Sequence, residues 1–193
     1  SHIRLEGHDL MTCDRDLAKS LRSKISMVFQ GSALFDSLPV WENICFGLLQ
    51  NKQIEKKEAH ALAVKRLAAV GLKPSVANLT PSELSGGMQR RVALARAVAS
   101  TPEILFCDEP TAGLDPIFSG VISDLIRQHV SELGCTTITI THDMTCARRV
   151  GDRIAMLYDG KLVWIGKPSE LDNSGNPFVH QFVHGQSQGP IKL

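Results

Sequence analysis

Two short segments near the middle of the chain carry residue types that handle phosphate groups. Residues 104–107 form an apolar run that ends in Asp108 and Glu109, a pattern that predicts a buried strand with two acid groups at its carboxyl end. In an open α/β sheet, ligands bind at that edge. Upstream, the turn Ser85-Gly86-Gly87 opens a predicted helix, whose free N–H groups and positive dipole end suit an anion. Together the two segments indicate chemistry on a phosphate.

Hydrolysis of a phosphate anhydride needs a metal ion, a positioned water and donors aimed at the leaving oxygens. Asp108 suits the metal, because Mg²⁺ takes few carboxylates and keeps several of its waters. Glu109 points to the same edge and suits the base that orients or deprotonates the water. Each segment alone has a simpler explanation. Asp-Glu-Pro is often a solvated strand end, and Ser-Gly-Gly is often an ordinary helix cap.

Three more polar residues lie at comparable places. His142 follows the apolar run 136–140, at the carboxyl end of another predicted strand, although an isolated histidine is more often structural. Asp115 precedes a predicted helix, and capping that helix is its simplest role. Gln30 follows the strand predicted up to Phe29, and its position before a helical region makes it a candidate.

The elements that must position these residues alternate along the chain. Strands are predicted at residues 3–5, 25–29, 104–107, 136–141, 154–158 and 162–165, the last two joined by a hairpin turn at Asp159-Gly160. Helices are predicted around residues 16–21, at 40–49, 54–70, after 81–84, at 117–133, 146–150, 168–171 and 177–184. The alternation predicts an α/β fold with a mainly parallel sheet. Residues 1–38 and 100–193 are expected to form its core, and residues 39–99 a helical subdomain.

Composition narrows the class of partner. The 21 Lys and Arg residues balance 20 acidic residues, and a net charge of +1 gives no electrostatic argument for nucleic-acid binding. No apolar stretch reaches the ~18 residues expected of a membrane span, so we expect membrane association only through a partner. The five cysteines are scattered without a C-x-x-C pair, which favours reduced thiols over disulfides or zinc.

Four motifs that follow one another along the chain are together more specific for a protein family than any one of them alone. They are Leu84-Ser85-Gly86-Gly87-Met88-Gln89, Ile104-Leu105-Phe106-Cys107-Asp108-Glu109-Pro110, Leu114-Asp115-Pro116 and Thr141-His142-Asp143. In this arrangement the chain closely resembles the ATPase subunits of ABC transporters, over essentially its whole length. The resemblance implies a P-loop NTPase-type ABC ATPase fold, ATP and Mg²⁺ as cofactors, and a head-to-tail homodimer that encloses two nucleotides.

The same resemblance assigns roles to individual residues. Glu109 and His142 would be catalytic, and Asp108 and Gln30 would hold Mg²⁺. The nucleotide-binding set would be Gln30, Ser85, Gly86, Gly87, Asp108, Asp115 and His142. In the family, the turn at 85–87 completes the site of the opposite subunit, and the loop that contains Asp115 couples the two sites.

The phosphate-cradling pattern G-x-x-x-x-G-K-[ST] does not occur in the 193 residues. We therefore expect an ABC ATPase that lacks its amino-terminal strand, phosphate loop and helix, and expect this chain by itself to be inactive. The resemblance places that strand beside the one ending at Asp108, so apolar side chains at 104–106 and 138–140 should be exposed. A non-hydrolytic interaction module is the alternative, and the gene sequence upstream of Ser1 would decide.

Further segments resemble one branch of the family. Residues 31–38, 40–44 and 176–185 are similar to the phospholipid-trafficking ATPases of the maintenance-of-lipid-asymmetry and toluene-tolerance systems. This implies a motor that moves phospholipid at the bacterial inner membrane, peripheral on its cytoplasmic face. Its permease would contact the chain near the segment from Gly31 to Asn43. A periplasmic lipid-binding subunit and a small cytoplasmic accessory protein would belong to the complex.

Other functions stay open at this point. An importer of amino acids or other small solutes would share every energy-coupling motif. A soluble ABC ATPase that acts on ribosomes or DNA is disfavoured by the neutral charge and by the single motif set.

Overall fold

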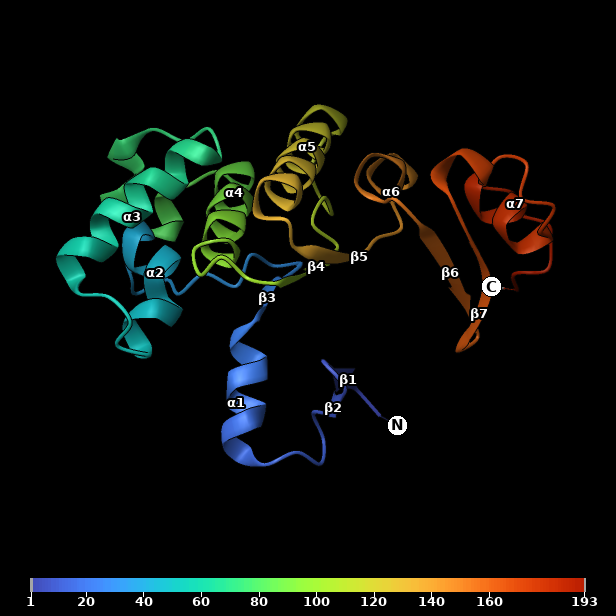
Figure 1. Ribbon diagram of the computed structural model, residues 1–193. Coiled ribbons are helices and arrows are strands. Elements are labelled where there is room, and N and C mark those ends of the chain that lie inside the picture. Colours follow the sequence, from blue (N-terminus) through green and yellow to red (C-terminus); the bar gives the residue numbers. More distant parts are fainter. Residues whose placement is uncertain (1, 193) are drawn as a thin grey trace.

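Three parallel strands lie at the centre of the molecule, with helices along one side (Figure 1). The computed structural model describes residues 2–192, so the outermost positions of the expected domains, 1 and 193, lie outside the described residues. The strands follow the order β3 (Ile25–Val28), β4 (Ile104–Asp108) and β5 (Thr136–Ile140). Val28 lies opposite Cys107, and Asp108 opposite Ile140. The three carboxyl ends therefore meet at one edge of the sheet.

The predicted α/β class is confirmed, and the parallel sheet is confirmed for β3, β4 and β5. The expectation of a further strand beside β4 is wrong, because β4 pairs with β3 along one edge and with β5 along the other. Two antiparallel pairs stand apart from this sheet. They are β1 (Arg4–Leu5) with β2 (His8–Asp9), and β6 (Ile154–Tyr158) with β7 (Lys161–Gly166).

The two faces of the parallel sheet differ in burial. Leu105 and Cys107 are buried, because they face the helices. Met27, Ile138 and Ile140 are exposed by 37%, 49% and 61%. The predicted exposure is therefore correct for β5 and wrong for Leu105, because successive side chains of a strand point to opposite faces.

Helices occupy most of residues 40–97 and form the left side of Figure 1. They are α2 (Val40–Gln50), α3 (Lys56–Ala69), the 3₁₀ turns η1 (Pro74–Asn78) and η2 (Pro81–Glu83), and α4 (Gly86–Ala97). Ile44, Leu67 and Val92 are at most 1% exposed and belong to one hydrophobic core with residues of β3 and β4. The division into a core and a subdomain at residues 39–99 stays a prediction.

Helix α3 starts at Lys56, two residues later than predicted. Glu55 caps the helix, and its N–H donates to the Glu58 carboxylate at 3.3 Å in a capping box. The end of the helix matches the prediction closely, with Gly71 in the left-handed region at φ 69°. Glycine adopts that conformation without a steric penalty.

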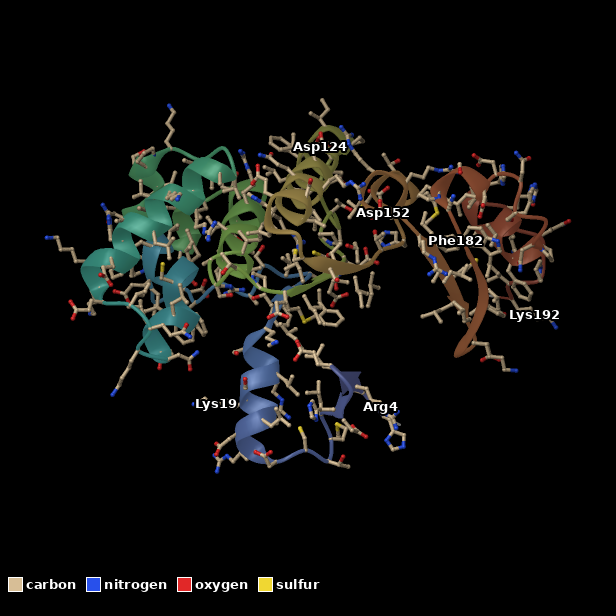
Figure 2. The ribbon with its side chains drawn as sticks, in the orientation of Figure 1. Arg4, Lys19, Asp124, Asp152, Phe182 and Lys192 are labelled. Atoms are coloured by element: carbon tan, nitrogen blue, oxygen red, sulfur yellow. The ribbon has the colours of Figure 1, made fainter. Side chains whose placement is uncertain are left out.

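Helix α5 (Pro116–Leu133) and the short helix α6 (Met144–Val150) flank the sheet on its helical side. Arg149 makes a two-pronged contact with Asp124, with N–O distances of 2.5 and 2.7 Å. Figure 2 labels Asp124 on α5 and Asp152 just after α6, where Arg127 pairs with Asp152 at 2.8 Å. Such exposed pairs add little stability, but the two-pronged geometry orients α6 against α5.

The remaining elements lie towards the two ends of the chain. Helix α1 (Arg15–Ser23) begins at the cap residue Asp14, and Lys24 contacts both Glu6 and Glu103. The turn at Asp159-Gly160 joins β6 to β7 as predicted. The 3₁₀ turn η3 (Pro168–Glu170) and α7 (Pro177–Val183) complete the fold. Within residues 2–192, no helix is long and apolar enough for a membrane crossing.

Candidate active site

Glu109 and His142 meet where β4 and β5 end. The Glu109 oxygen Oε1 accepts a hydrogen bond from the His142 backbone N–H at 3.1 Å and lies 2.9 Å from the ring atom Nδ1. The backbone N–H of Glu109 in turn donates to the carbonyl of Ile140 at 2.9 Å. The two residues that the sequence selected as catalytic are thus brought into direct contact by the parallel pairing of their strands.

The Glu109 backbone adopts an unusual conformation. Its φ of 45° lies in the left-handed region, which costs a residue with a side chain about 1–3 kcal/mol. The side chain is 17% exposed, and among the described residues its second oxygen, Oε2, is buried without a hydrogen-bond partner. A buried oxygen with no partner is a place where a water molecule or a ligand is expected. The conformation therefore holds one oxygen on His142 and leaves the other free.

The contact changes the electrostatics of the histidine. The hydrogen bond to Glu109 raises the pKa of His142 above its ordinary value, and the negative charge of the same carboxylate adds to this. The imidazole ring is 72% exposed. The pair therefore presents a protonatable, solvent-accessible donor beside a carboxylate, an arrangement suited to an anionic phosphate.

Asp108 and Gln30 lie at the ends of neighbouring strands. Asp108 is the last residue of β4, and Gln30 comes two residues after the end of β3 and is exposed. A carboxylate and an amide oxygen are the hard ligands that Mg²⁺ accepts. Within residues 2–192, no group of three His, Cys, Asp or Glu side chains could hold a metal. The oxygen donors of Asp108 and Gln30 are of the kind that Mg²⁺ takes while it keeps several waters.

The turn Ser85-Gly86-Gly87 forms the start of α4. Ser85 is the N-cap, and its hydroxyl accepts from the Met88 N–H at 3.3 Å. Gly86 and Gly87 open the helix, so their N–H groups have no acceptor within it. In the described part of the chain, no hydrogen bond links this turn to Asp108, Glu109 or His142.

Asp115 caps α5, as the simplest interpretation of the sequence predicted. Its carboxylate accepts from the N–H groups of Ile117 and Phe118 at 2.9 and 3.2 Å. The residue itself is exposed. Capping does not occupy the whole side chain, since both hydrogen bonds end on one oxygen, Oδ1.

Two groups of residues at the site were missed by the sequence reasoning. Asp143 caps α6 and also accepts from the hydroxyl of buried Thr111 at 3.2 Å, which ties the loop after Glu109 to the loop after His142. An acidic residue directly before a helix was the available signal. Arg90 and Arg96 reach loops about sixty residues away in sequence, and no local pattern points to such partners.

Comparison with known proteins identifies the family. The family model for the ABC transporter matches residues 1–112. The chain belongs to the ABC transporter ATP-binding family. The predicted resemblance is therefore confirmed at the level of the family.

Among curated ABC proteins, TRIGALACTOSYLDIACYLGLYCEROL 3 of Arabidopsis thaliana chloroplasts is 44% identical over 185 residues, covering 88% of this chain. The intermembrane phospholipid transport system ATP-binding protein MlaF of Escherichia coli K12 is 38% identical and covers 98%. The probable ribonucleotide transport ATP-binding protein mkl of Mycobacterium tuberculosis H37Rv is 35% identical and covers 99%. The chain spans 53%, 70% and 53% of these relatives, respectively.

Solved ABC cassettes have the same fold. A dimeric post-hydrolysis state of the cassette MJ0796 bound to ADP and Pi superposes with a TM-score of 0.76 at 34% identity, covering 86% of this chain and 73% of that one. A second dimeric structure of MJ0796 gives a TM-score of 0.77 at 33% identity. The α/β ABC ATPase fold is thus shown for this chain.

Proposed function

We propose that this chain is part of the ATPase subunit of an ABC transporter that moves phospholipid at the bacterial inner membrane. Its family membership makes it an ABC transporter ATPase domain. The observation that carries the catalytic assignment is the contact between Glu109 and His142 at the edge where the parallel strands end. That edge is where open α/β sheets bind their ligands.

In this proposal Glu109 is the general base. Water attacks the γ-phosphorus of ATP, the bond to the ADP oxygen breaks, and Glu109 takes the proton that the water loses. His142 holds one Glu109 oxygen and presents its ring to the γ-phosphate. Asp108 and Gln30 would hold Mg²⁺, which neutralises phosphate charge when bound. The other oxygen, Oε2, is buried without a hydrogen-bond partner among residues 2–192, and in this proposal it is the atom that acts on the water.

We further propose that two copies of the chain enclose the nucleotides head to tail. In this arrangement the turn Ser85-Gly86-Gly87 of one copy contacts the γ-phosphate held by the other, and Asp115 couples the two sites. The exposed position of Ser85 and Gly86, and the absence of a bond from that turn to Glu109 within residues 2–192, support action in trans. The solved cassettes of the family are described as dimers.

The permease contact is proposed around residues 31–43. Phe35 is 43% exposed, and its ring packs on that of Phe46 at a centroid distance of 4.3 Å. Phe46 lines an open hollow of ≈ 660 Å³, together with Leu38, other residues of α2 and the residues from Ile54 to Lys56. Asn43 is fully buried and binds the backbone of Phe35 and Leu38, so it shapes the loop from within. The chain would thereby be peripheral on the cytoplasmic face.

Phospholipid is the proposed cargo because two relatives carry lipid-related names. MlaF is named for intermembrane phospholipid transport, and the Arabidopsis protein for trigalactosyldiacylglycerol. A periplasmic lipid-binding subunit and a small cytoplasmic accessory protein complete the proposed complex. The mycobacterial relative is named for ribonucleotide transport, so nucleotide cargo is the comparison to include in the test.

The test uses the complete gene product, co-expressed with a candidate permease of the same organism and reconstituted in phospholipid vesicles. We expect Mg²⁺-dependent ATP hydrolysis and ATP-dependent transfer of a fluorescent phospholipid to an acceptor, both lost in Glu109→Gln. Transfer of ribonucleotide without transfer of phospholipid would overturn the cargo. Full ATPase activity in Glu109→Gln would overturn the catalytic assignment.

A further inference from the structure

Arg96 of α4 forms hydrogen bonds with the loop that follows Gln30. Its guanidinium donates through Nη1 to the carbonyl of Ala33 at 2.6 Å and through Nη2 to the carbonyl of Ser32 at 2.8 Å. The planar fork of an arginine suits two neighbouring acceptors, which the single ammonium of a lysine cannot match. One side chain therefore fixes two consecutive peptide groups.

The peptide groups that Arg96 binds belong to residues with an unfavourable backbone conformation. Ser32 and Ala33 have φ values of 62° and 48°, in the left-handed region that residues with a side chain avoid. Ser32 is also buried, and its N–H donates to the Phe29 carbonyl at 3.0 Å. Strained backbone persists only where its surroundings impose it. Arg96 contributes to this support with its two hydrogen bonds to these residues, beside the bond from Ser32 to Phe29.

Arg90, on the same helix, joins this loop to a second one. Its Nη1 donates to the carbonyl of Phe29 at 3.3 Å, directly before Gln30. Its Nη2 donates to the carbonyl of Ala112 at 2.9 Å, in the loop between Glu109 and Asp115. A single guanidinium thus connects the backbone beside a proposed metal ligand to the backbone beside the proposed base.

Helix α4, which carries both arginines, is packed into the hydrophobic core. Val92, Leu94 and Ala95 are at most 1% exposed and belong to the hydrophobic core. The helix starts at the N-cap Ser85, so the turn proposed to bind phosphate and the two arginines belong to one element. A packed helix moves as a unit, because its interior is dense and transmits displacement.

We propose that Arg90 and Arg96 are positioning residues that lock the loop at residues 29–33 and the loop at residues 110–115 to helix α4. A displacement of the Gln30 loop is then passed to the Ser85 turn and to the loop before Asp115. This coupling rests on the proposed function for its purpose, whereas the lock itself is a property of the folded chain.

The lock is tested by residue-resolved amide hydrogen exchange on the complete gene product. Arg96→Lys should raise exchange at the Ser32 amide by about tenfold or more, and Arg90→Lys should do so at Ala112 and Leu114, whose amides are bonded within their loop. Arg91→Lys is the matched control, since Arg91 lies on α4 and also donates to a carbonyl, that of Gly71 at 3.3 Å. It should change none of these amides.

The exchange is expressed relative to that of the Leu67 amide in the core helix α3, which separates local opening from global unfolding. Unchanged protection of Ser32 in Arg96→Lys and of Ala112 in Arg90→Lys would overturn the proposal. An equal rise in exchange at these amides in the control variant Arg91→Lys would also overturn the proposal. If Arg96→Lys lowers the protection of all amides, the variant is globally destabilised. The test then rests on Arg90→Lys, whose predicted effect falls on the amides of Ala112 and Leu114.

A kinetic readout checks the consequence for the site. In the ATPase assay of the complete gene product, Arg90→Lys should lower kcat by about fivefold or more and leave KM for ATP within about twofold, because positioning acts on the chemical step. A raised KM with unchanged kcat would contradict the positioning role. Absence of ATPase activity in the unaltered protein would remove the proposed function, and the exchange data would still decide on the lock.

Discussion

The carboxylate of Glu109 binds His142 at two points, its backbone N–H at 3.1 Å and its ring Nδ1 at 2.9 Å, and both bonds use the same oxygen. The strand ends thus hold a carboxylate and a histidine in one orientation, while the second carboxylate oxygen has no hydrogen-bond partner among residues 2–192.

In the complete gene product, Glu109→Gln should retain ATP binding and lower hydrolysis by about 10²-fold or more, the scale of a lost general base. Glutamine keeps the size of the side chain and an acceptor for the His142 N–H, so ATP binding should be retained. Because the bound ATP is not hydrolysed, a dimer with trapped nucleotide should accumulate. Binding is measured by equilibrium titration with ATP and turnover by phosphate release. Loss of binding as large as the loss of turnover would assign Glu109 to metal binding or structure. His142→Ala should also lower turnover more than binding.

The ring of His142 should titrate above its ordinary pKa of about 6.5. Because the folded-state pKa is raised, the contact stabilises the fold fully below the unfolded value, and this contribution is lost as pH rises through the folded pKa. Proton NMR of the ring should show the raised midpoint, and Glu109→Gln should return it towards the ordinary value. An unchanged midpoint in that variant would mean that Glu109 is not the cause.

Ser85 should act on the site of the opposite chain. Dimers that combine a Ser85→Arg chain with a Glu109→Gln chain should have one site with both defects and one with neither. About half of the normal site chemistry should survive if the sites are independent, and less if the loop at Asp115 couples them. ATPase assays on purified mixed dimers measure this. A mixed dimer in which each site retains a single defect would refute action in trans.

The buried cysteines should resist thiol reagents. Burial raises the pKa of Cys107 to about 12 and that of Cys45 to about 11, so almost no reactive thiolate forms at neutral pH. Cys13 is only partly buried and should be labelled first. Labelling with a chromogenic disulfide, followed by peptide mass spectrometry, gives the order. Labelling of Cys107 at the rate of Cys13 in the folded chain would contradict the burial.

The 193-residue chain alone should not hydrolyse ATP at a measurable rate. It contains no G-x-x-x-x-G-K-[ST] segment, and the nest of N–H groups and the lysine of that segment supply much of the binding of the phosphates. Phosphate release by the purified chain measures this directly. Robust Mg²⁺-dependent turnover would require another phosphate site within the printed residues.

Local order in this protein was readable from the sequence because it depends on contacts a few residues apart. Asp115 caps the helix that it precedes, and the Asp159-Gly160 turn joins its two strands, as the residue types predict. The ends of the strands at Asp108 and Ile140 were also close to those predicted, since apolar runs and their polar ends mark buried strands.

The neighbours of β4, the free oxygen of Glu109 and the partners of Arg90 and Arg96 were decided only by the tertiary structure. Strand order depends on which edges pair after collapse, and β4 took β3 and β5 on its two sides. Glu109, whose φ is positive, forms bonds to Ile140 and His142, more than thirty residues away in sequence. The arginines reach carbonyls that any residue type supplies, so no side-chain pattern marks them. Long-range packing alone selects such partners.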